Sequence, residues 1–202
     1  MSAIDQFLVG IGLLCISASY RLPPVDRIDL QACLSVQSVL TVRPWISFFK
    51  LLWYFGRTEA VLIAIIGLTP FSPRQGISAA LAFLAWGGID RLLKVAFKRV
   101  RPFERQPGTQ MLQARRPSDP SFPSGDAFHA WFLALIAIQA FQLPLLVSIV
   151  VVLLAVLISL GRVVLGVHYP FDVLAGTGIG IAAASSGMLL NDAITLIPGF
   201  RF

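Results

Sequence analysis

The chain has 202 residues, of which 13% are charged and 56% are hydrophobic, and its mean hydropathy is +0.80. Soluble domains carry about 25% charged residues, so this composition excludes an ordinary soluble protein. It also excludes a disordered chain, which combines low hydrophobicity with high charge. At roughly 20 residues per span, the chain has room for about six membrane-spanning helices.

The net charge of +6 comes from 16 Lys and Arg against 10 Asp and Glu. In a soluble protein such an excess would suggest nucleic acid as a partner, but in an apolar chain it favours a membrane surface or an anionic substrate. Cys15 and Cys33 form no disulfide framework, and Cys15 is expected as a buried free thiol in an apolar run. Residues 1–10 contain no Lys or Arg, so the start lacks the basic region of a cleavable signal peptide.

The first apolar run, Phe7–Tyr20, reaches the length of a span when Ser2–Gln6 is included. Leu22–Pro44 is too polar to cross a membrane, and within it Asp29–Leu40 is expected to lie at the interface with its apolar face on lipid headgroups. The second span is predicted at Trp45–Leu68.

Arg57 and Glu59 interrupt the second span. Side chains two residues apart on a helix do not face each other, so each is expected to need a partner on another helix. Asp90 and Arg91 are the candidate partners.

Four further spans are predicted, at Gly76–Val95, Ser124–Phe141, Leu145–Leu160 and Phe171–Leu190. The predicted fold is therefore all-α, a six-transmembrane-helix bundle with a short interfacial helix after the first span. We expect one domain over residues 1–202, with its functional motifs within 94–172. In this topology the ends of spans three and five and the starts of spans four and six meet on one side of the membrane, where they gather three polar clusters.

The first cluster, Lys94–Arg101, contains four cations and precedes Pro102. Lys94 and Arg101 are seven residues apart, which is two helical turns, so they are expected to share a face and to hold one anion between them. The alternative is a basic collar at the membrane interface.

The second cluster begins the fourth span. Ser124 is a favourable N-cap, and Gly125 lets another group approach closely. The free N–H groups of a helix start form an anion site, although ordinary capping explains the same residues.

The third cluster contains Arg162, His168 and Asp172. Because His168 and Asp172 are four residues apart, the carboxylate is expected to orient the imidazole, as in catalytic triads. Arg162 offers a planar fork for phosphate oxygens. Two histidines without nearby cysteines do not make a zinc site, so the set indicates metal-free phosphoryl transfer through a phosphohistidine.

These residues resemble a known family. Lys94-x6-Arg101-Pro102, Pro123-Ser124-Gly125 and Arg162-x5-His168-x3-Asp172 look like the three-part signature of the type 2 phosphatidic acid phosphatase superfamily, which are integral-membrane lipid phosphatases related in active site to vanadium haloperoxidases. The resemblance spans about residues 45–190. It implies that His168 is the nucleophile and that Asp172 orients it, with no cofactor and no metal. It further implies that the phosphate is bound by Lys94, Arg101, Ser124, Gly125 and Arg162.

The chain departs from the family pattern at Gly161, where the family usually has Ser, and at Asp126, where it usually has the His that protonates the leaving oxygen. A protonated Asp126 is one candidate catalytic acid, and His129 is another. Alternatively, the need for an acid is small, because the leaving group is itself a phosphate with a pKa of about 6–7. A site that binds phosphate but turns over poorly is also consistent with Asp126.

The resemblance thus predicts hydrolysis of a terminal phosphate from polyprenyl diphosphate, phosphatidylglycerol phosphate, phosphatidic acid or a lipid A phosphate. The alternatives are a lipid phosphotransferase with the same intermediate and a non-catalytic protein that binds or transports anionic lipid. We expect a protein of the bacterial inner membrane with its site at the periplasmic face. The positive-inside rule points the other way, since Arg21, Arg27 and Arg43 lie on the site's side, against little beyond Arg74 and Arg201 opposite.

Overall fold

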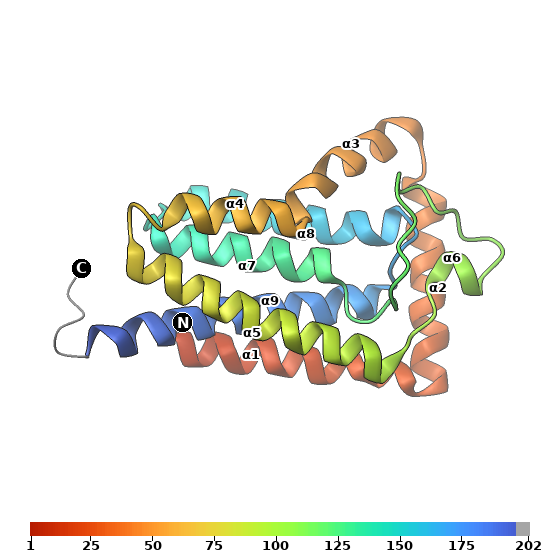
Figure 1. Cartoon of the computed structure of the whole chain (residues 1–202). Helices are drawn as coiled ribbons and strands as arrows, with labels where there is room; N and C mark the ends of the chain where they lie inside the picture. The colour runs from red at the N-terminus through yellow and green to blue at the C-terminus, as the bar shows by residue number, and fades with distance from the viewer. Residues whose placement is uncertain (197–202) are drawn as a thin grey trace.

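The computed structural model describes residues 1–196, so Arg201 lies outside the described residues (Figure 1). Every regular element in this part of the chain is helical. The elements are α1 (Ala3–Ser17), η1 (Ala18–Arg21), α2 (Pro23–Leu40), α3 (Arg43–Trp53), η2 (Tyr54–Gly56), α4 (Thr58–Leu68), α5 (Pro73–Phe97), α6 (Pro102–Arg105), α7 (Gly125–Ala140), α8 (Leu145–Val164) and α9 (Pro170–Thr195).

Helix α9 is the centre of the bundle, and small residues let its neighbours approach closely. A Cβ on Gly178 would lie 2.6 Å from the carbonyl oxygen of Gly10 in α1, and one on Gly180 would lie 2.6 Å from the carbonyl oxygen of Phe128 in α7. Interfaces between membrane helices are rich in small residues, because these residues allow the helix backbones to approach closely. Contact of α9 with both helices fixes where the polar ends of these elements meet.

The helices match a membrane in length and composition. Four helices are long and apolar enough to cross a membrane, and a fifth span is added if α3–η2 and α4 are counted as one bent span. Helix α7 is apolar but shorter. Large apolar side chains cover the outer surface, as Leu84, Ile66 and Leu146 illustrate at 68%, 70% and 78% exposure. Such exposure is favourable only where lipid, rather than water, surrounds the bundle.

The predicted second span is not one straight helix. It is broken at Gly56 and Arg57 and bent by 48° between its halves. Because Arg57 has an extended backbone (φ −83°, ψ 156°), its guanidinium reaches Glu59 at 2.5 Å. The prediction that these two side chains need partners on another helix was therefore wrong.

Helix α2 lies across one end of the bundle (Figure 1) and begins six residues earlier than the predicted interfacial helix. Pro23 and Pro24 account for the early start, because proline suits the first turn of a helix. Its buried face carries Asp29, Cys33 and Gln37, spaced four apart. The buried face of α2 is thus polar and covers the end of the bundle, while Ile28 and Val39 are exposed.

The two cysteines differ in their surroundings. Cys33 is buried and Cys15 is exposed on the outer face of α1, so the prediction of a buried Cys15 was wrong. Three helices extend beyond their predicted ends, with α5 reaching Phe97, α8 reaching Val164 and α9 reaching Thr195, whereas α7 (Gly125–Ala140) is one residue shorter than predicted at each end.

Candidate active site

The chain turns sharply after α5. Lys98 adopts a left-handed conformation (φ 46°, ψ 37°), which ends the helix, so Lys94 and Arg101 do not share a helical face. The reversal nevertheless brings the two side chains to one place, since both contact the carboxylate of Asp119. The predicted pairing of these cations is found, but a turn creates it rather than two turns of helix.

A second turn delivers His168. Gly166 has a φ of 73°, which glycine adopts without strain, and its N–H bonds the carbonyl oxygen of Val163 at 2.9 Å. The chain can therefore reverse between α8 and α9 and place His168 just before α9. A side chain at Gly166 would collide with the backbone of Gln110.

The imidazole of His168 is held at both nitrogens. Nδ1 lies 2.7 Å from the carbonyl oxygen of Ser121, and Nε2 lies 3.3 Å from Nη1 of Arg101. A carbonyl oxygen only accepts, so Nδ1 carries the proton and Nε2 keeps its lone pair. Burial lowers the pKa of His168 to about 4, and the Arg101 charge acts in the same direction, so the imidazole is neutral at pH 7.

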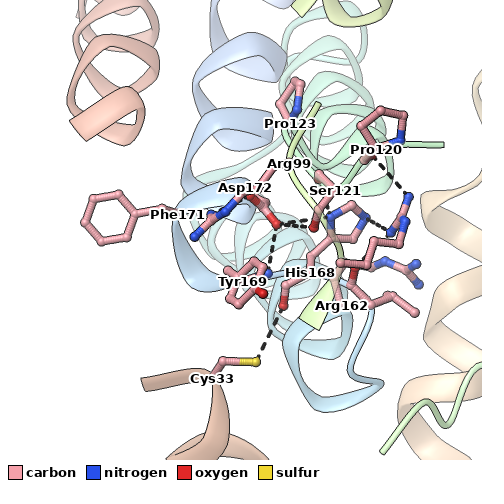
Figure 2. A network of polar contacts seen from close by, with 12 residues as sticks. Cys33, Arg99, Pro120, Ser121, Pro123, Arg162, His168, Tyr169, Phe171 and Asp172 are labelled. Carbon is pink, nitrogen blue, oxygen red and sulfur yellow. Dashed lines mark hydrogen bonds and ion pairs between the residues drawn. The ribbon is translucent and has the colours of Figure 1, made fainter. Parts of the chain in front are cut away.

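Asp172 lies beside His168, as its spacing predicted. Its Oδ2 is 3.6 Å from Nδ1 of His168, and the same oxygen accepts from Ser121 Oγ at 2.5 Å and from the backbone N–H of Tyr169 at 2.9 Å. Figure 2 shows Asp172, Ser121 and His168 side by side, with Arg162 near the imidazole. Asp172 thus lies beside the neutral imidazole without a direct hydrogen bond to it, and it positions the ring through Ser121, whose hydroxyl donates to Asp172 and whose carbonyl oxygen accepts from Nδ1.

Arg99 is a buried residue of this network that the sequence analysis did not single out. Its guanidinium contacts Asp172 at 2.7 Å and Asp29 of α2 at 2.7 Å, with Asp26 at 3.2 Å. The guanidinium lies against the rings of Tyr20 and Tyr169, 3.8 and 4.0 Å from their centroids. In the sequence Arg99 is one of four clustered cations, and no local signal separates it from Lys98, which is exposed.

The first phosphate-binding pair predicted from the sequence holds a carboxylate. Lys94 Nζ is 3.1 Å from Asp119 Oδ2, and Arg101 Nη2 is 2.8 Å from Asp119 Oδ1. Partial burial raises the pKa of Asp119, but the charges of Lys94 and Arg101 outweigh burial and lower this pKa to about 2. Asp119 is therefore ionised, and two cations already share one anion.

Arg162 is buried and has free donors. Its Nη2 contacts Asp126 at 2.9 Å and Gln113 at 2.5 Å. Its Nε and Nη1 are buried without a hydrogen-bond partner among residues 1–196. Buried guanidinium donors without partners are costly, so these two atoms mark a position suited to an anion.

The start of α7 is open where Ser124 and Gly125 were predicted to bind phosphate. Ser124 occupies the N-cap position, but its Oγ is buried without a partner in the described part of the chain. A Cβ on Gly125 would meet no atom within 4 Å. An unpartnered hydroxyl and open space at a helix start are features suited to an anion.

His129 lies elsewhere. Its Nδ1 is 2.9 Å from the carbonyl oxygen of Gly56, and its ring packs on Phe83 and Phe128. The ring is thus held by α5 and η2, deeper in the bundle than Asp126. Among residues 1–196, no group of three His, Cys, Asp or Glu side chains is arranged to hold a metal ion.

The Arg99 network predicts a measurable loss of stability. Replacing Arg99 with Ala leaves Asp29 and Asp172 as uncompensated buried charges, and we expect the free energy of unfolding to fall by about 3–5 kcal/mol. Denaturation in detergent measures this loss. The control is Arg115→Ala, which removes an exposed arginine from the same loop region and is expected to change stability by less than about 0.5 kcal/mol. Equal stability of the two variants would contradict the role assigned to Arg99.

Several known proteins are similar to this chain in sequence and in fold. Residues 75–194 match the model of the PAP2 superfamily. Undecaprenyl-diphosphatase of Sulfolobus acidocaldarius is 31% identical over 137 residues, which cover 67% of this chain and 58% of that protein. Decaprenylphosphoryl-5-phosphoribose phosphatase of Mycobacterium tuberculosis is 32% identical over 160 residues, which cover 76% of this chain and 85% of that protein.

The crystal structure of a transmembrane PAP2-type phosphatidylglycerolphosphate phosphatase from Bacillus subtilis has the same fold. Its TM-score is 0.73 and its identity 23%, with 99% of each chain covered. The family model spans more than half of the chain and includes all three polar clusters. This chain is therefore a member of the PAP2 superfamily, with the helical membrane fold of that family.

Proposed function

We propose that this protein is an integral-membrane lipid phosphatase that uses His168 as its nucleophile. The observation that carries the proposal is the state of the imidazole: Nδ1 lies 2.7 Å from the carbonyl oxygen of Ser121 and 3.6 Å from Asp172, and the lone pair of Nε2 faces Nη1 of Arg101. A neutral, oriented imidazole beside guanidinium groups is suited to attack phosphorus.

The reaction has two displacements. Nε2 of His168 forms a bond to phosphorus while the bond from phosphorus to the lipid oxygen breaks, and the electron pair leaves with that oxygen. Water then attacks the phosphohistidine, which releases inorganic phosphate and restores the imidazole. Charge on the transferred group is stabilised by Lys94, Arg101 and Arg162, together with Ser124 and the N–H groups at Gly125.

An apolar pocket supports a substrate with a hydrocarbon chain. It has a volume of about 250 Å³ and lies between α4, α7 and α8. Its lining follows α7 from Ala130 to Phe141, a length of roughly 16 Å, and includes the exposed Leu154. The pocket ends close to Asp126, because a Cβ added at Gly56 would lie 2.9 Å from Ile158 of the lining and 3.3 Å from the Cβ of Asp126.

The pairing of Asp126 with Arg162 supports a diphosphate substrate. The carboxylate of Asp126 lies 2.9 Å from Nη2 of Arg162, so this oxygen accepts from the guanidinium and is not directed at a leaving group. His129 is turned toward Gly56. A leaving phosphate needs little protonation, since its pKa of about 6–7 is far below that of an alcohol. Both sequence relatives above are named for polyprenyl substrates, and one of them is named for a diphosphate, so within the four predicted lipid classes we favour a polyprenyl diphosphate.

We also propose that residues 1–202 form one domain and that the chain crosses the membrane six times. Helix α7 has 16 residues, about 24 Å of rise, against a hydrocarbon core of about 30 Å. Its N-cap residue Ser124 is buried in the protein, and we infer that the helix begins below the membrane surface.

The site is proposed to face the periplasm at the inner membrane of a bacterium, as the family resemblance implies. Lys94, Arg101 and Arg162 serve the site, so they are poor reporters of orientation under the positive-inside rule. With six crossings both termini lie opposite the site. A fluorescent protein fused after Phe202 is expected to fluoresce in the cytoplasm, and alkaline phosphatase fused there is expected to be inactive; the reverse pattern would place the site in the cytoplasm.

His168→Ala is expected to lower kcat with a polyprenyl diphosphate by at least about 10³-fold, because the attacking atom is lost. The wild-type protein is expected to retain ³²P from labelled substrate after rapid acid-free denaturation, and His168→Ala is not. His129→Ala serves as the matched control and keeps the label. Phosphate release by His168→Ala at the wild-type rate would exclude the proposed mechanism.

Asp126→His installs a proton donor at the position where the family usually has one. We expect kcat for lipid monophosphates to rise by about 10²-fold, because an alcohol leaving group needs the proton, while kcat for the diphosphate changes little. Asp126→Asn is the control, because it removes the charge and adds no acid. A fall of the diphosphate rate in Asp126→Asn, with that rate retained in Asp126→His, would instead identify Asp126 itself as the catalytic acid.

A further inference from the structure

We propose that Asp119 occupies the phosphate subsite in the free protein and leaves it when a phosphate group binds. The inference rests on the proposed function and concerns the affinity of the same site. Asp119 lies in the segment between α6 and α7, within neither helix.

The contacts of Asp119 divide into a fixed part and a releasable part. Its backbone oxygen accepts from Arg101 Nε at 2.8 Å, which holds the segment in place. Its carboxylate bridges Arg101 Nη2 at 2.8 Å and Lys94 Nζ at 3.1 Å. Rotation of the side chain alone frees both cations, and no backbone contact has to break.

The carboxylate can move out because it is on the water side of the site. Its side chain is 51% exposed, whereas the side chains of Arg101 and Lys94 are 4% and 12% exposed. After rotation the carboxylate is hydrated, and the two buried cations need another anion. Arg101 Nη1 remains bonded to the carbonyl oxygen of Val167 at 2.8 Å, so the guanidinium keeps its position beside His168.

A terminal phosphate can replace the carboxylate. It carries a charge of about −1.5 to −2 at pH 7 and three acceptor oxygens, against one charge and two oxygens for Asp119. The third oxygen can take the free donors of Arg162. Every anion that binds has to displace Asp119, so Asp119 lowers the affinity of the site for the substrate and for inorganic phosphate by the same factor. The lower affinity for inorganic phosphate limits retention of this product after turnover.

Asp119→Asn removes the competing charge at constant size. For the full-length protein in detergent, we expect KM for a polyprenyl diphosphate and the inhibition constants of inorganic phosphate and orthovanadate to fall together by roughly three- to thirtyfold. We expect kcat to stay within about twofold. Asp119→Glu retains the charge and is expected to lie between Asp119→Asn and the wild type.

Glu104→Gln is the matched control. It removes one negative charge from the same face of the protein, but Glu104 pairs with Arg116 rather than with Lys94 or Arg101. An equal fall of KM in Glu104→Gln would mean that general electrostatic attraction, not occupancy, sets the affinity. Unchanged constants in Asp119→Asn, or a fall of kcat at constant KM, would overturn the inference. If His168→Ala abolishes activity while Asp119→Asn leaves KM and the inhibition constants unchanged, the inference about Asp119 fails and the proposed function stands.

Discussion

The buried guanidinium of Arg99 is the interaction on which the site depends. It joins Asp29 and Asp26 of α2 to Asp172 of α9, and it lies between the rings of Tyr20 and Tyr169. A single buried charge with three carboxylates has few alternative arrangements, so the position of α2 over the bundle is closely tied to the orientation of Asp172. Through Ser121, that orientation reaches the imidazole of His168.

Charge balance in an apolar bundle explains the rest of the site. Each predicted phosphate-binding cation is paired: Lys94 and Arg101 with Asp119, and Arg162 with Asp126. Unpaired buried cations would cost several kcal/mol each, so a protein that binds an anion only intermittently needs internal counter-ions. The two carboxylates differ in what they permit, because Asp119 is half-exposed and can rotate into water, whereas Asp126 is mostly covered.

Particular residues show why prediction from sequence succeeded in part. The His168–Asp172 and Lys94–Arg101 pairs were expected to be close because of helical spacing, yet His168 precedes α9 and Arg101 follows α5. Turns at Gly166 and Lys98 bring them together instead, and a left-handed turn at a lysine has little sequence signal. The break between α3 and α4 was missed for a similar reason, since the apolar run continues through it.

By itself, the sequence determined that the protein is a bundle of membrane helices with three polar clusters on one side, because hydropathy and span order depend only on the chain. It also determined which chemical groups are present, and hence the family. Only the tertiary structure decided which charges pair. The roles of Arg99, Asp119 and the polar face of α2 depend on contacts between residues 18 to 142 positions apart, and no local pattern encodes such distances.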